Sequence, residues 1–154
     1  MRRLLLLLVS LAVGGCNSTP SPPPFHPVAD VKQLMAMVIE PAAEVYWDAV
    51  GTVIDVSGRT QIEPQTTEEW DAVRNSAYVL TESGNLLMMR TGSNGGDEWM
   101  QLSRTMIDIG QKAIKAAEAH DTKAVFDVGA ELYDACTFCH AKYAPETQRP
   151  SARQ

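Results

Sequence analysis

The chain has few cysteines, few histidines and few aromatic residues. Its 154 residues include three cysteines and three histidines, and aromatic residues make up 6%. A structural zinc site normally needs four Cys or His ligands at regular spacing, and the further partners are missing. A thioredoxin-like dithiol is expected in a βαβ context, and the sequence contains no convincing alternating strand pattern. Both classes of site are therefore poor interpretations of the cysteines.

The chain is also short of positive charge. It has 13 lysines and arginines against 19 aspartates and glutamates, which gives a formal net charge of −6. Proteins that bind nucleic acid need Lys/Arg patches to meet the phosphates, so no nucleic-acid partner is expected. Neither a P-loop nor a dinucleotide-binding glycine pattern is present.

No apolar run at the N-terminus is long enough to cross a bilayer. Arg2 and Arg3 precede a short apolar segment, residues 4–13, as in an export signal. Small residues then lead directly into Cys16, in a pattern that resembles the bacterial lipobox. We therefore predict a lipoprotein signal peptide over residues 1–15 and lipidation of Cys16. An ordinary secretory signal, with cleavage nearby, and a free Cys16 are the alternatives.

Residues 16–29 are predicted to be a lipidated, proline-rich tether. Prolines favour extended conformations and do not build a core, and five lie here: Pro20, Pro22, Pro23, Pro24 and Pro27. His26 lies in this segment and is a poor candidate ligand, because a mobile tether holds no fixed geometry. Asn17 is not the aspartate associated with inner-membrane retention, so the outer membrane is weakly favoured.

The most specific motif is Cys136-Thr137-Phe138-Cys139-His140, which has the spacing of a c-type haem attachment sequence. Each thiol can add across one haem vinyl group, and the imidazole can coordinate the iron. Positions i, i+3 and i+4 share a helix face, so Cys136, Cys139 and His140 can reach one macrocycle. The alternatives are a redox dithiol, half of a zinc site or two buried thiols. Covalent haem attachment takes place outside the bacterial cytoplasm, which agrees with the export signal.

Apolar residues recur at helical spacing from Asp30 onwards. The first helix carries Pro41, which predicts a kink without a stop and without a change of phase. Residues 51–64 are predicted to be a loop. A second helix is predicted over residues 66–89, with Thr66 and Glu69 as a capping box. The predicted seams of the first two helices are Val31, Leu34, Met35, Val38, Ala42, Val45, Tyr46 and Ala49, then Trp70, Val73, Ala77, Leu80, Gly84 and Leu87.

Two more helices follow a glycine-rich turn at residues 91–96. The third is predicted from Asp97 to about His120, and Asp121 or Thr122 is predicted to cap the fourth. Their seams are Trp99, Leu102, Met106, Ile109, Ala113 and Ala116, then Val125, Val128, Leu132, Ala135 and Cys139. We therefore predict an all-α protein, an antiparallel four-helix bundle over residues 30–145 with haem attached on its C-terminal helix. Residues 146–154 are predicted to be a C-terminal tail.

A haem motif on the last of four helices resembles the class II c-type cytochromes, the cytochrome c′ and cytochrome c556 group. The most specific residues of this resemblance are Cys136, Cys139, His140 and Tyr143. It implies one covalent haem c, with His140 as the proximal iron ligand. The chain departs from the family at Ala144, where members often carry a basic residue.

The resemblance also implies that a first-helix residue faces the iron opposite His140. Cytochrome c556 places a methionine there, whereas cytochrome c′ places an apolar residue and leaves the position open. Met35 and Met37 are two residues apart and so point in nearly opposite directions. Met35 lies on the apolar stripe and is the candidate distal ligand, with core packing as its alternative.

Other candidate side chains have simpler interpretations. Met88, Met89, Met100 and Met106 are expected to be packing or surface residues. His120 is expected to interact with a helix dipole, and Tyr46 and Trp47 to line the core or the haem pocket.

The resemblance predicts an electron carrier and not an enzyme, since no acid–base pair or nucleophile stands out beside the motif. It would be anchored by lipid on the periplasmic side and exchange single electrons with redox partner proteins. The alternatives are a five-coordinate protein that binds NO or CO, and a haem-free helical interaction lipoprotein. A homodimer remains open, because an apolar stripe does not distinguish internal from intersubunit packing.

Overall fold

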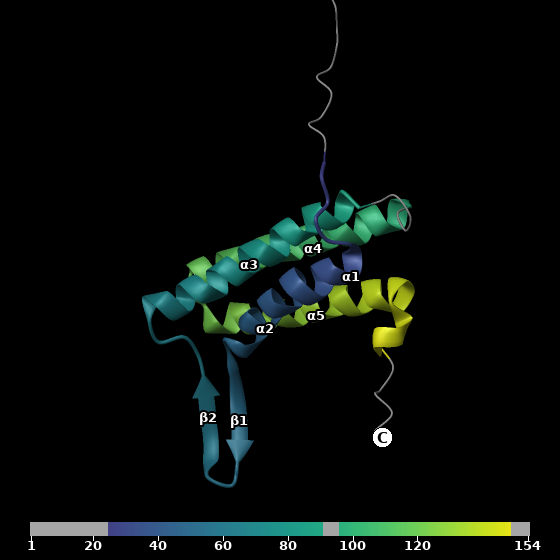
Figure 1. Cartoon of the computed structure of the whole chain (residues 1–154). Coiled ribbons are helices and arrows are strands. Elements are labelled where there is room, and N and C mark those ends of the chain that lie inside the picture. Colours follow the sequence, from purple (N-terminus) through teal and green to yellow (C-terminus); the bar gives the residue numbers. More distant parts are fainter. Residues whose placement is uncertain (1–24, 91–95, 149–154) are drawn as a thin grey trace, which may run out of the picture.

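The computed structural model describes residues 25–90 and 96–148, which form four helices and a two-stranded hairpin (Figure 1). The first helix has three parts: α1 (Val31–Leu34), the π-helix η1 (Met35–Ile39) and α2 (Glu40–Asp48). Three long helices follow the hairpin: α3 (Thr67–Met88), α4 (Asp97–Glu118) and α5 (Thr122–Tyr143). A short 3-10 helix, η2 (Pro145–Gln148), succeeds α5. The prediction of a mostly helical protein is confirmed.

The long helices pack antiparallel to their neighbours in sequence, α3 against α4 and α4 against α5 (Figure 1). The first helix packs mainly against α3 and makes fewer contacts with α5. The predicted signal peptide, Cys16 and residues 16–24 of the predicted tether lie outside the described residues, as do residues 91–95 and 149–154.

Side-chain caps start the helices where the sequence predicts. Asp30 accepts a hydrogen bond from the backbone N–H of Gln33 at 2.7 Å and caps α1. Thr66 and Glu69 form the predicted capping box of α3. Asp121 accepts from the backbone N–H of Ala124 at 2.9 Å and caps α5.

The core follows the predicted seams of α3 and α4, which approach each other closely at two glycines. An added Cβ at Gly110 would lie 2.3 Å from Thr81 Oγ1, and one at Gly84 would lie 2.5 Å from a side-chain carbon of Ile107. All six predicted seam residues of α3 are buried. In α4, Trp99, Met106, Ala113 and Ala116 are buried, while Leu102 and Ile109 are half-buried.

The first helix continues through Pro41, as predicted, but it changes phase. Leu34 and Ile39 are both buried and five residues apart, which is the step of a π turn. The backbone N–H of Glu40 donates to the carbonyl of Met35, five residues back. A proline ring clashes with the carbonyl four residues before it, and the wide turn directly precedes Pro41. Beyond Val38, Ala42 and Tyr46 are buried and Ala49 is half-buried, as predicted. Val45 is instead exposed, and Ile39 and Ala43, which the predicted stripe leaves out, are buried.

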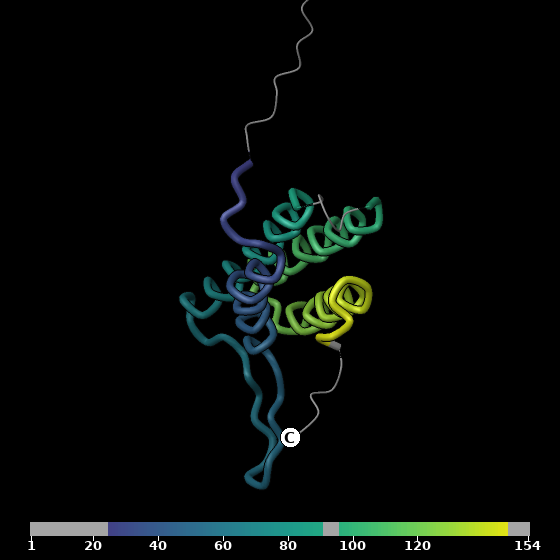
Figure 2. Tube along the Cα trace, turned by 45° about the vertical axis from the view of Figure 1, so that its right-hand side comes forward, coloured from purple at the N-terminus to yellow at the C-terminus, as the bar shows by residue number. Residues whose placement is uncertain are grey.

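The predicted loop at residues 51–64 is instead a hairpin of β1 (Gly51–Asp55) and β2 (Gly58–Ile62), followed by residues 63–64 without regular structure. Asp55 holds its turn by accepting hydrogen bonds from the backbone N–H and the hydroxyl of Ser57. Gly58 has a φ of 129°, which side chains with a Cβ rarely adopt. The hairpin projects from the helices (Figure 2), and almost all of its side chains are exposed. With neither face buried, the strands need no alternating pattern.

Candidate functional site

The last helix carries all three side chains of the predicted haem-attachment motif. Cys136, Cys139 and His140 lie at positions i, i+3 and i+4 of α5 and are half-buried, whereas Phe138 between them is 68% exposed. The two thiols and the imidazole therefore lie on the partly buried side of a continuous helix, which fixes their spacing.

Both cysteines are free thiols, and burial raises their pKa values. For Cys136 the pKa rises to about 11, mainly through burial and secondarily through the nearby Cys139. Reactive dithiols need a lowered pKa, because the thiolate is the nucleophile. The raised values count against a redox dithiol.

The half of α5 that carries the motif is less buried than its first half. The buried residues of α5 are Val125, Val128, Gly129 and Leu132, all in its first half. None of the side chains at residues 133–143 is fully buried, although they include apolar and aromatic groups. Two thiols, an imidazole and this partly covered apolar surface fit a large apolar group such as haem.

Aromatic packing anchors the end of α5 beside the motif. Tyr143 meets Trp99 of α4 edge to face, with ring centroids 5.0 Å apart and planes at 87°. The indole N–H of Trp99 donates to the carbonyl of Leu87 at 2.8 Å, which fixes that ring in the core. Lys142 pairs with Glu98 on the outside of the same contact.

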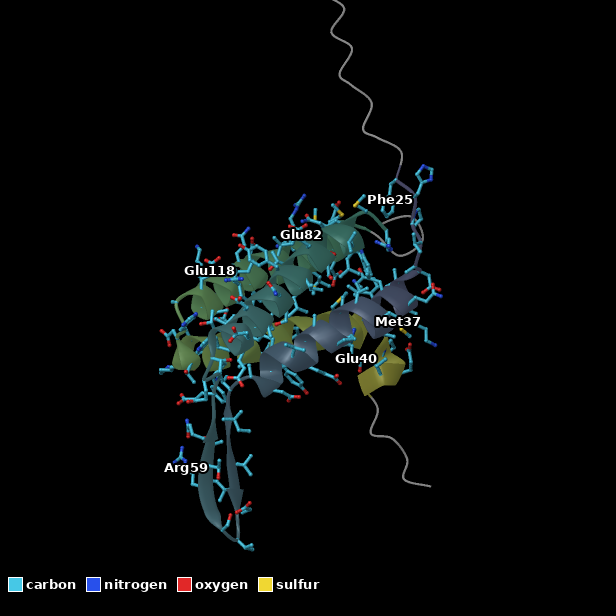
Figure 3. All side chains as sticks on the ribbon, turned by 60° about the vertical axis from the view of Figure 1, so that its left-hand side comes forward. Phe25, Met37, Glu40, Arg59, Glu82 and Glu118 are labelled. Atoms are coloured by element: carbon cyan, nitrogen blue, oxygen red, sulfur yellow. The ribbon has the colours of Figure 1, made fainter. Side chains whose placement is uncertain are left out.

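The two methionines of the first helix have different surroundings. Met35 begins η1 and is half-buried against the core. Met37, which Figure 3 labels, is 75% exposed. The start of α1 and the motif end of α5 lie at the same end of the molecule (Figures 1 and 3). Met35 therefore remains the better candidate of the two for a ligand opposite His140.

The remaining candidates are structural or exposed. Met106 is buried, Met88 and Met100 are half-buried, and Met89 and His26 are exposed. The structure gives His120 a role that the sequence did not indicate. It has a φ of 52°, ends α4 in a left-handed cap, and stacks on Trp70 with centroids 4.7 Å apart.

Tyr46 and Trp47 lie in or against the core, as predicted, and Trp47 makes a long-range hydrogen bond that the sequence did not predict. The indole N–H of Trp47 donates to the carbonyl of Gly129 at 2.9 Å. Tyr46 is fully buried, and its hydroxyl has no hydrogen-bond partner in the described part of the chain. The Trp47 hydrogen bond depends on the adjacency of α2 and α5, so no local sequence pattern could have revealed it.

Three His, Cys, Asp or Glu side chains do not come together as a metal site anywhere in residues 25–90 and 96–148. A haem iron is held by the porphyrin and needs only an axial side chain, so His140 alone suffices.

In the described residues, 25–90 and 96–148, no helix has the length and apolar character needed to cross a bilayer. Comparison with protein-family models, curated proteins and solved structures found no match.

Proposed function

We propose that the protein is a lipid-anchored, periplasmic class II c-type cytochrome that carries single electrons. The observation that carries this proposal is the position of Cys136, Cys139 and His140. They lie half-buried on one continuous helix, in the part of α5 that has no fully buried side chain. The antiparallel arrangement of the long helices supports the bundle that such a protein needs.

In this proposal the chain holds one haem through two thioether bonds, at Cys136 and Cys139, and through the imidazole of His140. The bound haem supplies a reversible one-electron couple at its iron. The chain sets the potential through axial ligation and burial, and it presents one haem edge to redox partners. No catalytic residues are proposed.

Met35 is proposed as the second axial ligand. Met35 is half-buried, whereas Met37 is mostly exposed. This difference supports Met35 over Met37 as the ligand. The packing of Met35 against the core also favours a second candidate function, in which the methionine is filler and the iron takes up NO or CO.

The proposed location rests on the sequence before the described residues. Lipid on Cys16 and the proline-rich tether of residues 16–29 would hold the protein at the periplasmic side of a membrane, with the outer membrane favoured. We expect Cys16→Ser to move the protein from the membrane fraction to the soluble fraction. A variant that remains fully in the membrane would contradict the lipid anchor.

The haem proposal is tested by expression with the bacterial haem-attachment machinery, followed by intact mass measurement under denaturing conditions. We expect the unmodified chain to keep the added mass of one haem under denaturing conditions. The Cys136→Ala/Cys139→Ala variant should show no covalent haem addition. A free dithiol in the unmodified chain would leave the haem-free interaction lipoprotein as the surviving function.

The distal ligand is tested by optical spectra of the ferrous protein before and after CO is added. We expect a low-spin spectrum that resists CO, and we expect Met35→Ala to admit CO. Met37→Ala is the matched control and should leave the spectrum unchanged. A high-spin unmodified protein that binds CO directly would make gas binding the leading function.

A further inference from the structure

A groove of about 390 Å³ lies between α2 and residues 125–134 of α5, and Cys136, Cys139 and His140 do not line it. Its lining includes Trp47 from α2 and Phe126, Gly129 and Tyr133 from α5. The lining reaches Asp134, two residues before Cys136, so the groove lies next to the motif without including it. Its volume is in the usual range for small-molecule sites, about 300–1,000 Å³.

The aromatic wall of the groove is held in place by the backbone of Gly129. Its carbonyl accepts the indole N–H of Trp47 at 2.9 Å. A Cβ at this position would lie 3.3 Å from Trp47 Cδ1, so the glycine permits the close approach of the indole. The rings of Trp47 and Tyr133 stand 6.0 Å apart with planes at 65°, as two inclined walls.

The third aromatic side chain, Phe126, lies two turns before Tyr133 on α5. Phe126 and Tyr133 are both 61% exposed, so a ligand can reach them from solvent.

The charged residues of the groove lining indicate which class of ligand suits it. Asp134 is the only acidic residue of the lining, which includes no lysine, arginine or histidine. Aromatic faces carry partial negative charge and attract cations, most strongly those with a weakly hydrated, alkylated surface. Asp134 adds a full negative charge at the same place. A single carboxylate is a poor site for a metal ion but a suitable counter-ion for an organic cation.

We propose that this groove binds a quaternary ammonium group, with its methyl groups against the rings of Trp47, Phe126 and Tyr133 and its charge near Asp134. The group can come from a free solute of the choline type or from a lipid head group. This site uses none of the three motif residues, and its Tyr133 and Asp134 lie just before them on α5.

The test is calorimetric titration of the matured full chain with choline and with 3,3-dimethylbutan-1-ol, an uncharged isostere in which carbon replaces nitrogen. We expect saturable binding of choline, at least about fivefold tighter than binding of the isostere. Tyr133→Leu and Asp134→Asn should each weaken choline binding at least about threefold. Both side chains are exposed, so neither change should unfold the protein.

Phe138→Leu is the matched control, because Phe138 is an exposed aromatic residue of the same helix that does not line the groove. It should leave choline binding unchanged. The Cys16→Ser variant, which lacks the proposed lipid anchor, is used for sedimentation with phosphatidylcholine vesicles. Sedimentation that free choline reverses would assign the group to a lipid, whereas binding of free choline alone would assign it to a solute. Equal affinity for choline and its isostere, no saturable binding, or equal weakening by Phe138→Leu would each overturn the proposal.

Discussion

At the scale of single residues, Tyr46 carries a cost that nothing in the described chain offsets. Its side chain is fully buried, and its hydroxyl is the one buried side-chain polar atom of residues 25–90 and 96–148 that lacks a partner. Burial also raises its pKa well above the ordinary value for tyrosine. Leaving a buried donor unpaired costs about 1–3 kcal/mol, whereas removing it costs little if the ring still packs.

We therefore expect Tyr46→Phe to stabilise the haem-free protein by about 1 kcal/mol in the free energy of unfolding. Urea denaturation followed by circular dichroism measures this change. Tyr78→Phe is the matched control, because the Tyr78 hydroxyl is exposed and makes only a 3.3 Å hydrogen bond to Glu118; it should change stability by less than about 0.5 kcal/mol. A loss of stability in Tyr46→Phe would mean that the hydroxyl has a partner.

The thiol of Cys136 gives a pH dependence that only the haem-free protein should have. Its pKa is about 11 in the folded chain, against about 8.5 for an unfolded cysteine. The folded state binds the proton more tightly, so this contribution to stability is complete below about pH 8.5 and is lost as the pH rises toward 11. Alkylation of Cys136 by iodoacetamide, followed by peptide mass, should accelerate through the same range.

Two controls separate this titration from others at high pH. Cys136→Ser should remove the part of the stability loss at alkaline pH that comes from the Cys136 thiol. Attachment of haem to Cys136 should remove the same part, because a thioether has no proton to lose. Fast alkylation of Cys136 at pH 8 in the folded chain would contradict the raised pKa.

At the scale of elements, α3 and α4 depend on glycines where the helices touch. A Cβ at Gly110 would meet Thr81 Oγ1 at 2.3 Å and Thr81 Cα at 3.0 Å, and backbone cannot move aside cheaply. We expect Gly110→Ala to lower the free energy of unfolding by about 1–3 kcal/mol, despite the better helix propensity of alanine. Thermal unfolding measures this loss of stability. Gly51→Ala is the control, because a Cβ added there meets nothing within 4 Å. An equal loss of stability in Gly110→Ala and Gly51→Ala would contradict the packing argument.

The elements that the sequence predicted correctly are those with local causes. Thr66 with Glu69, and Asp121, start helices through hydrogen bonds three residues away, so spacing alone reveals them. The hairpin was missed because its strands bury neither face, and only Asp55 and Gly58 mark its turn. The π turn before Pro41 was missed because a strict 3.6-residue period cannot represent one extra residue.

The same distinction applies to the sites. The haem motif is predictable because Cys136, Cys139 and His140 are close in sequence. The groove and the unpaired Tyr46 hydroxyl are not, because they arise where α2 meets α5, about 80 residues apart, as the Trp47 to Gly129 hydrogen bond illustrates.

At the scale of the whole molecule, the helices differ in how firmly the chain alone holds them. α3 and α4 share the most extensive interface, while α2 packs mainly on α3 and makes fewer contacts with α5. The second half of α5, residues 133–143, has no fully buried side chain. Local opening should therefore be easiest in this half-helix and in the first helix, and hardest in α3 and α4.

Haem attachment should change this order. A haem held by Cys136, Cys139 and His140, and approached by Met35, would connect the two weakly joined elements. We expect hydrogen exchange to slow by about tenfold in residues 133–143 and 31–48 on haem attachment, with much smaller changes in the buried parts of α3 and α4. Exchange monitored by mass spectrometry compares the matured protein with the Cys136→Ala/Cys139→Ala variant. Slowing confined to residues 133–143 would mean that the first helix does not reach the haem, which would leave Met35 as core packing. Equal slowing in every helix would mean that the four helices already open as one unit, because α3 and α4 could then gain protection only through global stability.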